Sequence, residues 1–388
     1  MKPLSASLAA VSSLALLATT SLASAAVPTI DTAAQTAIVI DYDTGNVLYN
    51  KNAEQRIPPA SMSKIMTAYV VYAYLKAGRV KLDDTLPVSE KAWAKHKTNE
   101  SNMFVPLGAQ VKVEDLIRGM IIQSGNDACV VLAEGLAGST DAFVDQMNKT
   151  AEKLGLKNSH FTDVDGLPDP DEYVTAHDLA VLAMDLIHDF PEYFHYDAEK
   201  EFTYNNIKQG NRNPLLYKDL GVDGMKTGHT EEAGYGITVT ALRNGRRVIE
   251  VLSGMKSMNA RSQESEKLLA WAYREWNDYK LVKAGDPLDD APAPVFLGTT
   301  ATVPVTVKSD LLVSLPRNAR SSMKVTAVYD QSTPAPVAQG QQVGMLQISA
   351  NDMNPVQVPL VAAKPVDKVG GLSRAALAAG YLLFGKKN

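Results

Sequence analysis

The order of strand-like and helix-like segments restricts the fold of this chain more than any other feature. β-rich runs occupy residues 37–50, and two more occupy residues 235–254 on either side of Asn244-Gly245. An Asn-Gly pair between β-rich runs is typical of a tight hairpin. Segments with helical period lie at 64–78, 113–125, 140–155, 175–190 and 261–279. We therefore expect an α+β fold, in which strands from both ends form one antiparallel sheet and helices pack on it.

The composition changes near residue 285 and predicts a second domain. Residues 285–294 (GDPLDDAPAP) are rich in Pro and Asp, which is typical of a linker. Short β-rich runs separated by turns follow from residue 295 to residue 363, and this pattern predicts a small all-β domain. We expect a first domain at 26–284 and an all-β domain at 285–365. The second domain is expected to act as a spacer or an interaction module rather than as a second active site.

Short apolar segments lie near both ends of the sequence. Residues 1–25 resemble a secretory signal, with Lys2 before an apolar run and Ala23-Ser24-Ala25 as a cleavage site; the alternative is an uncleaved anchor. Ala375–Phe384 is a second apolar run between basic residues. A bilayer span needs about 20 apolar residues. We therefore predict that the tail at 366–388 forms a short helix on a membrane surface, the alternative being a frayed or packed terminal helix.

Composition argues against several classes of function. The net charge of −5 is not the footprint of a nucleic-acid-binding protein. Cys129 is the only cysteine, so the chain has no internal disulfide, and we expect this residue to be a small buried hydrophobe in a helix. The six histidines show no His-Glu-x-x-His spacing, and one cysteine cannot build a cysteine-rich zinc site. We predict neither a metal nor another cofactor.

Three short motifs occur in a fixed order: Ser61-Met62-Ser63-Lys64, Ser124-Gly125-Asn126 and Lys226-Thr227-Gly228. A serine and a lysine three residues apart on a helix share one face, so the amine can take the hydroxyl proton without a histidine. Ser-x-x-Lys also starts at Ser253 and Ser321. However, Ser253 ends a strand-like run, in which residues i and i+3 face opposite sides, and Ser321 lies in a polar turn. The ordered triple is the signature of serine acyl-transfer enzymes that handle penicillin-like and D-alanyl substrates.

Three longer segments surround these motifs: PASMSKIMTAYVV, LIRGMIIQSGNDACVVLAE and VDGMKTGHTEEAGYGI. They resemble the low-molecular-mass penicillin-binding proteins of the penicillin-binding protein 5 type, which are serine D-Ala-D-Ala carboxypeptidases. The resemblance covers nearly everything after residue 25. It implies a penicillin-binding, transpeptidase-like domain, then an all-β domain and a short amphipathic C-terminal helix. It also implies a periplasmic enzyme on the outer face of the cytoplasmic membrane, with peptidoglycan pentapeptides as substrates and β-lactams as covalent inhibitors.

The resemblance also implies roles for individual residues. Ser61 would be the nucleophile, and Lys64 would be the base that activates it. Burial and the second cation Lys226 are expected to lower the pKa of Lys64. The alternative is a charged Lys64 that only orients Ser61. Ser124 would pass a proton to the leaving amine, and Asn126 would hold the peptide group of the substrate.

The third motif and its surroundings are expected to bind the substrate. The residues that would do so are Thr227, Gly228, His229, Thr230 and Arg261. The backbone amides of Ser61 and His229 would form the oxyanion hole. Arg261 would lie near the terminal carboxylate of the substrate; the alternative is a solvated charge at the start of a helix.

Three other functions stay open: a DD-endopeptidase, a weak β-lactamase and a non-catalytic peptidoglycan-binding protein. Class A β-lactamases carry a Glu-x-x-Leu-Asn segment between the second and third motifs, and no such segment lies between Asn126 and Lys226. A binding protein would not need Ser61 and Lys64 to be intact. The chain departs from the family at Asp165, where some relatives carry His, so its deacylation rate and substrate preference stay open.

Overall fold

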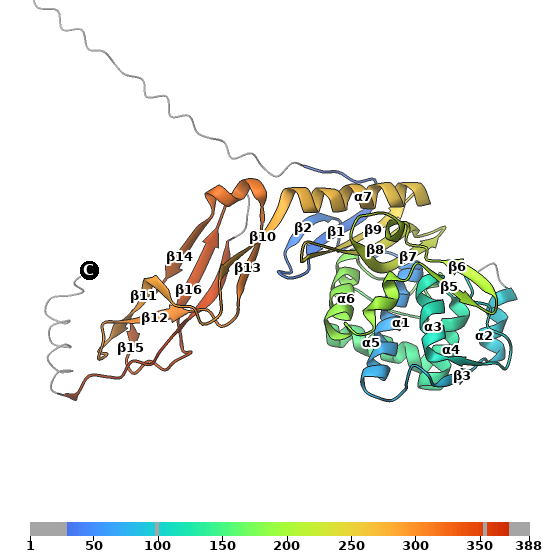
Figure 1. Ribbon diagram of the computed structural model, residues 1–388, viewed down its shortest axis with the longest axis horizontal. Helices are drawn as coiled ribbons and strands as arrows, with labels where there is room; N and C mark the ends of the chain where they lie inside the picture. The colour runs from blue at the N-terminus through green and yellow to red at the C-terminus, as the bar shows by residue number, and fades with distance from the viewer. Residues whose placement is uncertain (1–28, 98–100, 352–354, 372–388) are drawn as a thin grey trace, which may run out of the picture.

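The computed structural model describes residues 29–97, 101–351 and 355–371, which form a larger α+β part and a smaller β-rich part (Figure 1). The larger part contains a five-stranded antiparallel sheet with the strand order β2-β1-β9-β8-β7. Its strands are β1 (Thr36–Asp41), β2 (Val47–Lys51), β7 (Val222–Thr230), β8 (Gly234–Arg243) and β9 (Arg246–Met255). β1 and β2 precede the main group of helices and β7–β9 follow it. The predicted α+β class and the meeting of strands from both ends are therefore confirmed.

Helices cover both faces of this sheet. α7 lies along one face, whereas α6 and α1 lie on the other (Figure 1). Every residue of β1 is buried, with Ile38 and Ile40 in the core of the helical side and Ala37 and Val39 in the core under α7. Alternate residues of a strand face opposite sides, so a strand covered on both faces is apolar throughout. The α-helices are α1 (Lys64–Lys76), α2 (Glu90–Ala94), α3 (Val113–Ile122), α4 (Asn126–Ala137), α5 (Thr140–Leu154), α6 (Ala176–Asp189) and α7 (Met258–Glu275).

α1 is the central helix of the larger part. Its residues are apolar around nearly the whole circumference, and it contacts α3, α4, α5 and α6. A helix that is hydrophobic on all sides is stable only when neighbouring elements surround it. A 3₁₀ turn, η1 (Ala60–Ser63), leads directly into α1. The buried helix therefore gives this turn a rigid support.

Local sequence signals explain where several of these elements begin. Ser139 accepts a hydrogen bond from the amide of Ala142 at the start of α5, and Thr175 caps α6 in the same way. Such side chains satisfy amides that have no partner inside the helix. Asn244-Gly245 forms the predicted tight turn between β8 and β9, with positive φ at both residues. Two small antiparallel pairs complete the larger part: β3 (Thr85–Pro87) with β4 (Gln110–Lys112), and β5 (Glu201–Tyr204) with β6 (Ile207–Gly210).

The smaller part contains only strands and one 3₁₀ turn among its described residues, in agreement with the predicted all-β domain. One sheet has the order β14-β16-β17-β12-β11-β15, and β10 pairs with β13 in a second sheet. Its elements are β10 (Trp276–Val282), β11 (Leu288–Phe296), β12 (Thr302–Thr306), β13 (Leu311–Pro316), η5 (Arg317–Ser322), β14 (Lys324–Val328), β15 (Thr333–Pro334), β16 (Gln342–Ser349) and β17 (Val356–Ala362).

The linker that we predicted at residues 285–294 is wrong, because most of this segment belongs to β11. Ala293 is buried and pairs with Val303 of β12. The pairing is irregular between Leu288 and Ala293, and such irregular stretches tolerate proline in a strand. We expected the β-rich part to begin after residue 284. β10 lies before that residue but pairs with β13, so the β-rich part includes residues from Trp276 onward.

A buried arginine joins the two parts. Arg246, at the start of β9, places Nε 2.9 Å from Oδ2 of Asp41 and 3.1 Å from Oδ1 of Asp278 in β10. Its Nη1 donates to the carbonyl oxygen of Trp276, and its Nη2 donates to Oγ of Ser314. Burial, reinforced by the charge of Asp41, raises the pKa of Asp278 to about 6. One guanidinium group therefore ties the central sheet to the first strands of the β-rich part.

Two predicted segments fall outside the described residues. They are the secretory signal at 1–25 and residues 372–388 of the tail predicted at 366–388. Val366 and Lys368, at the start of that predicted tail, are described and form bridges with Val337 and Gly298 of the β-rich part. Within the described residues, no helix has both the length and the apolar composition that crossing a membrane requires.

Candidate active site

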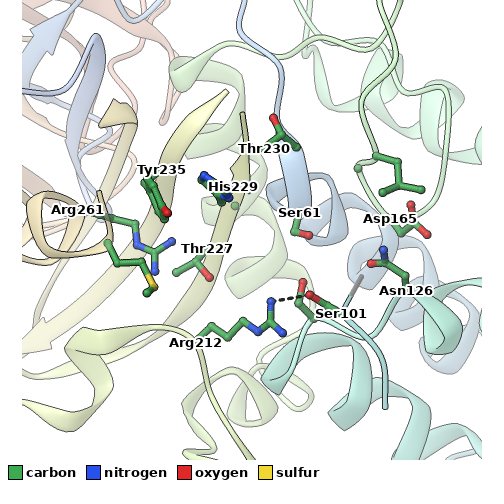
Figure 2. A pocket seen from close by; sticks show the side chains of 15 residues that line it. Ser61, Ser101, Asn126, Asp165, Arg212, Thr227, His229, Thr230, Tyr235 and Arg261 are labelled. Carbon is green, nitrogen blue, oxygen red and sulfur yellow. Dashed lines mark hydrogen bonds between the residues drawn. The ribbon is translucent and has the colours of Figure 1, made fainter. Parts of the chain in front are cut away.

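The three motifs meet at one cavity of about 540 Å³ (Figure 2). Most of the residues predicted from the sequence line it: Ser61, Ser124, Asn126, Thr227, Gly228, His229, Thr230 and Arg261. The two predicted lysines, Lys64 and Lys226, are buried. They come from α1 and β7, which place the first and third motifs beside each other.

The first motif forms the 3₁₀ turn and the first residue of α1. In a 3₁₀ turn the side chains at i and i+3 eclipse each other, and Nζ of Lys64 lies 3.0 Å from Oγ of Ser61. The amine also donates a hydrogen bond to the carbonyl oxygen of Asp165. Lys64 is only 2% exposed, so the amine contacts the hydroxyl from the protein side while Ser61 faces the cavity.

The second motif lies between two helices. α3 ends at Ile122 and α4 begins at Asn126, so the helix break exposes the motif to the cavity. Ser124 adopts a left-handed conformation with φ of 64°, which is strained for a residue other than glycine. Its buried Oγ has no hydrogen-bond partner among the described residues. A buried hydroxyl with free hydrogen-bonding capacity is suited to a group that arrives with the substrate.

The third motif lies on β7, at the edge of the five-stranded sheet. Nζ of Lys226 donates to the carbonyl oxygen of Thr227 at 3.0 Å. Burial lowers the pKa of Lys226 well below its ordinary value, and the charge of Lys64 lowers it further. A β-carbon on Gly228 would lie 2.9 Å from the carbonyl oxygen of Pro59. Glycine is therefore required here because β7 passes so close to η1 (Ala60–Ser63), the turn that carries Ser61 and is called the nucleophile turn below.

Arg261 and Arg212 place two positive groups on the cavity wall. Arg261 comes from the first turn of α7 and is 5% exposed, so the alternative of a solvated charge at a helix start is wrong. Burial lowers its pKa to about 10, and its Nε has no hydrogen-bond partner among the described residues. Figure 2 shows the guanidinium group of Arg212 reaching Ser101, and its Nη1 lies 2.5 Å from Oγ of that serine. These groups favour an anionic ligand.

The sequence reasoning missed several lining residues: Ser101, Gly166, Leu167, Arg212, Tyr235 and Met258. None belongs to one of the three motifs. Tyr235 could have been found from strand register, because it pairs with His229 across β7 and β8 and stacks on its ring at 3.9 Å. Asp165, which we noted only as a departure from the family, is buried at the cavity and forms an ion pair with Lys95 at 2.8 Å.

Cys129 is fully buried on α4, as predicted, and its Sγ lies 3.3 Å from the carbonyl oxygen of Gly125. Burial raises the pKa of its thiol to about 12, so it is not a reactive nucleophile. The described residues contain no group of three or more His, Cys, Asp or Glu side chains that could hold a metal ion.

Comparison with known proteins covers both parts of the chain. Residues 21–257 match the D-alanyl-D-alanine carboxypeptidase family, and residues 276–368 match the penicillin-binding protein 5 C-terminal domain. The chain is 40% identical over 352 residues to D-alanyl-D-alanine carboxypeptidase DacC of Escherichia coli strain K12, covering 89% of this chain and 87% of that protein.

Two solved structures bear on the fold and on the cavity. Penicillin-binding protein 5 of Haemophilus influenzae superimposes with a TM-score of 0.81 at 37% identity, over 88% of this chain and 99% of that chain. Penicillin-binding protein D2 of Listeria monocytogenes, in its ampicillin-bound form, has a TM-score of 0.57 at 30% identity. That match covers 63% of this chain and 99% of the Listeria chain.

Proposed function

This chain belongs to the D-alanyl-D-alanine carboxypeptidase family, and from that premise we propose that it removes the terminal D-alanine from peptidoglycan pentapeptides through an acyl-enzyme on Ser61. One observation carries the proposal: the buried amine of Lys64 lies 3.0 Å from Oγ of Ser61. A serine hydroxyl is a weak nucleophile, and it is activated by a base within hydrogen-bonding distance. A protein that only bound peptidoglycan would not need this contact.

We assign the acyl transfer to the first two motifs. Oγ of Ser61 attacks the carbonyl carbon of the penultimate D-alanine as Nζ of Lys64 takes the hydroxyl proton. The backbone amides of Ser61 and His229 stabilise the oxyanion. The peptide C–N bond then breaks, and the proton reaches the leaving amine by way of Ser124. Water completes the cycle by hydrolysing the ester, which restores the Ser61 hydroxyl and releases the shortened peptide.

Strand β7 and the positively charged side chains at the cavity would bind the substrate. β7 lies at the end of its sheet, so an extended peptide can lie along its free edge. Thr227 and Thr230 both line the cavity from this strand, and Arg261 lies beside Thr227 (Figure 2). The guanidinium of Arg261 and the ammonium of Lys226 supply the positive potential that a terminal carboxylate needs. Asn126, on the opposite wall, would hold the peptide group.

We infer that β-lactams acylate the same serine. The Listeria relative has been solved with ampicillin bound, and its similarity covers 63% of this chain. A β-lactam presents a strained amide to Ser61, and its carboxylate is suited to the groups that would bind the substrate carboxylate. The chain lacks the Glu-x-x-Leu-Asn segment of class A β-lactamases, so we expect the resulting ester to hydrolyse slowly.

We further propose that the protein is exported and works at the outer face of the cytoplasmic membrane. Residues 1–25 would be removed during export, and the tail at 366–388 would lie on the lipid surface. The all-β part would hold the catalytic part away from that surface. Deleting residues from Gly371 onward should move the protein from the membrane fraction to the soluble fraction. Unchanged recovery with membranes would count against the anchor.

D-alanine release from diacetyl-Lys-D-Ala-D-Ala tests the main proposal. The wild-type protein should release D-alanine and capture labelled penicillin, and Ser61→Ala should abolish both. No release by a folded wild-type protein that still captures penicillin would point to an endopeptidase. Failure of both reactions would point to a binding protein.

A further inference from the structure

Glu172 is a buried acid beside the nucleophile turn, and no step of the acyl transfer uses it. Its side chain is 4% exposed, and its Oε1 accepts a hydrogen bond of 2.7 Å from Oγ of Ser63. Ser63 is fully buried and lies in the chain between Met62 and Lys64. Glu172 therefore holds the nucleophile turn at a residue that does not line the cavity.

The segment that carries Glu172 makes two more contacts with the same end of α1. The hydroxyl of Thr67 donates to the carbonyl oxygen of Val164 at 2.8 Å, and the amine of Lys64 donates to that of Asp165. The segment lies between α5 and α6 and therefore has rigid supports on both sides. Of the three contacts that fix the turn to this segment, only the one to Glu172 depends on an ionisable acceptor.

Glu172 is not placed to activate the hydrolytic water. It does not line the main cavity, which Ser61 faces. It lines a separate cavity of about 10 Å³, together with Ala60, Gly166 and Thr230. This volume suits about one water molecule. The role of Glu172 must therefore be exerted through the turn and not by contact with the acyl group.

The charges around Glu172 determine which form of the carboxyl group the site accepts. Asp163 and Asp165 lie on its own segment, and Lys64 faces it from α1. Burial, together with the charges of Asp163 and Asp165, raises the pKa of Glu172 to about 8, against the opposing effects of the Ser63 hydrogen bond and of Lys64. The neutral acid therefore prevails at pH 7. An ionised Glu172 would be buried next to Asp163 and Asp165, so ionisation disfavours this arrangement of the segment.

We propose that Glu172 is a positioning residue for the nucleophile: its buried carboxyl group accepts the hydrogen bond of Ser63 and thereby keeps Ser61 against Lys64. Because the buried site disfavours the ionised carboxylate, this function should weaken at alkaline pH. The inference rests on the proposed role of Ser61 as the nucleophile. It adds a residue that acts on the Ser61–Lys64 pair without touching the substrate.

The test compares Glu172→Ala and Glu172→Gln by stopped-flow acylation with labelled penicillin and by D-alanine release, from pH 6 to pH 10. A misplaced reactive group costs on the order of 100-fold, so we expect Glu172→Ala to lose about 10- to 100-fold in kcat. KM should change little, because the cavity-lining residues are untouched. Glu172→Gln keeps the acceptor for Ser63 but cannot ionise. It should restore most of the rate at pH 7 and lack the alkaline fall of the wild type.

Asp171→Asn is the matched control, since Asp171 is an exposed acid next to Glu172. Its pH profile should follow that of the wild type. Wild-type rates in Glu172→Ala, or an unchanged alkaline fall in Glu172→Gln, would overturn the proposal. If Glu172→Ala does not fold, the pH profile of Glu172→Gln decides alone. Penicillin capture by the wild type and by Ser61→Ala, measured in the same series, reports separately on the role of Ser61.

Discussion

Replacing Gly166 with alanine should disable the nucleophile turn. Gly166 has a φ of +78°, and a β-carbon there would lie 2.0 Å from the carbonyl oxygen of Ala60 and 3.1 Å from the amide nitrogen of Ser61. The left-handed conformation costs a residue with a β-carbon about 1–2 kcal/mol. Relieving the contact with Ala60 requires a backbone movement of more than an ångström. A shift of that size at the attacking serine costs on the order of 100-fold in rate.

The matched control for this substitution is Gly245→Ala. Gly245 has nearly the same φ, +80°, but nothing lies within 4 Å of its added β-carbon. Gly245→Ala should lose about 1–2 kcal/mol of stability and Gly166→Ala more, because only the latter also has to relieve a contact, and each kcal/mol lowers Tm by roughly 2–4 °C in a domain of this size. Only Gly166→Ala should lose acylation, measured with labelled penicillin by stopped flow. If Gly166→Ala acylates as fast as Gly245→Ala, the steric argument is wrong.

Two further predictions concern buried titratable groups. The folded protein lowers the pKa of Lys226, so its ammonium form destabilises the fold below that lowered pKa, and the lost stability is recovered as pH rises from the lowered pKa toward the ordinary lysine range. Lys226→Met should therefore raise Tm at pH 7 while lowering D-alanine release at least about 100-fold; a lower Tm in calorimetry would contradict the burial argument. Cys129 should resist iodoacetamide at pH 8 in the native protein and react after denaturation, and rapid native labelling, followed by mass spectrometry, would show that the thiol is accessible.

The elements that could be predicted from the sequence are those with strong local signals. The Asn244-Gly245 turn specifies its hairpin through backbone geometry alone, and the apolar run after Ser61 can only be a buried helix. β11 could not be predicted, because its Pro and Asp residues are typical of a linker while its buried residues, such as Ala293, are small. β10 was missed for a different reason: it directly follows α7, and its partner β13 lies about 30 residues further along.

The site residues also divide into those with a local sequence signal and those that only the fold brings together. Ser61, Lys64 and the other motif residues could be found because each motif is a short contiguous pattern. Arg212 and Glu172 lie in segments whose only signal is their place in the fold, and each meets its partner across about 100 residues of chain. Without the fold, a lone glutamate or arginine in a polar segment is most simply read as a solvated charge.

The pairing of β1 with β9 has a consequence for how the chain matures. Thr36 pairs with Ser253, so the two central strands are separated by about 200 residues of sequence. Contacts of such long range slow folding, because the loop must close before the pairing stabilises it. The nucleophile helix is synthesised early, but β7–β9 come much later, and until then β1 has an open, apolar edge. Until β9 is available the chain is therefore inactive, and the open edge of β1 stays exposed to pairing with other chains.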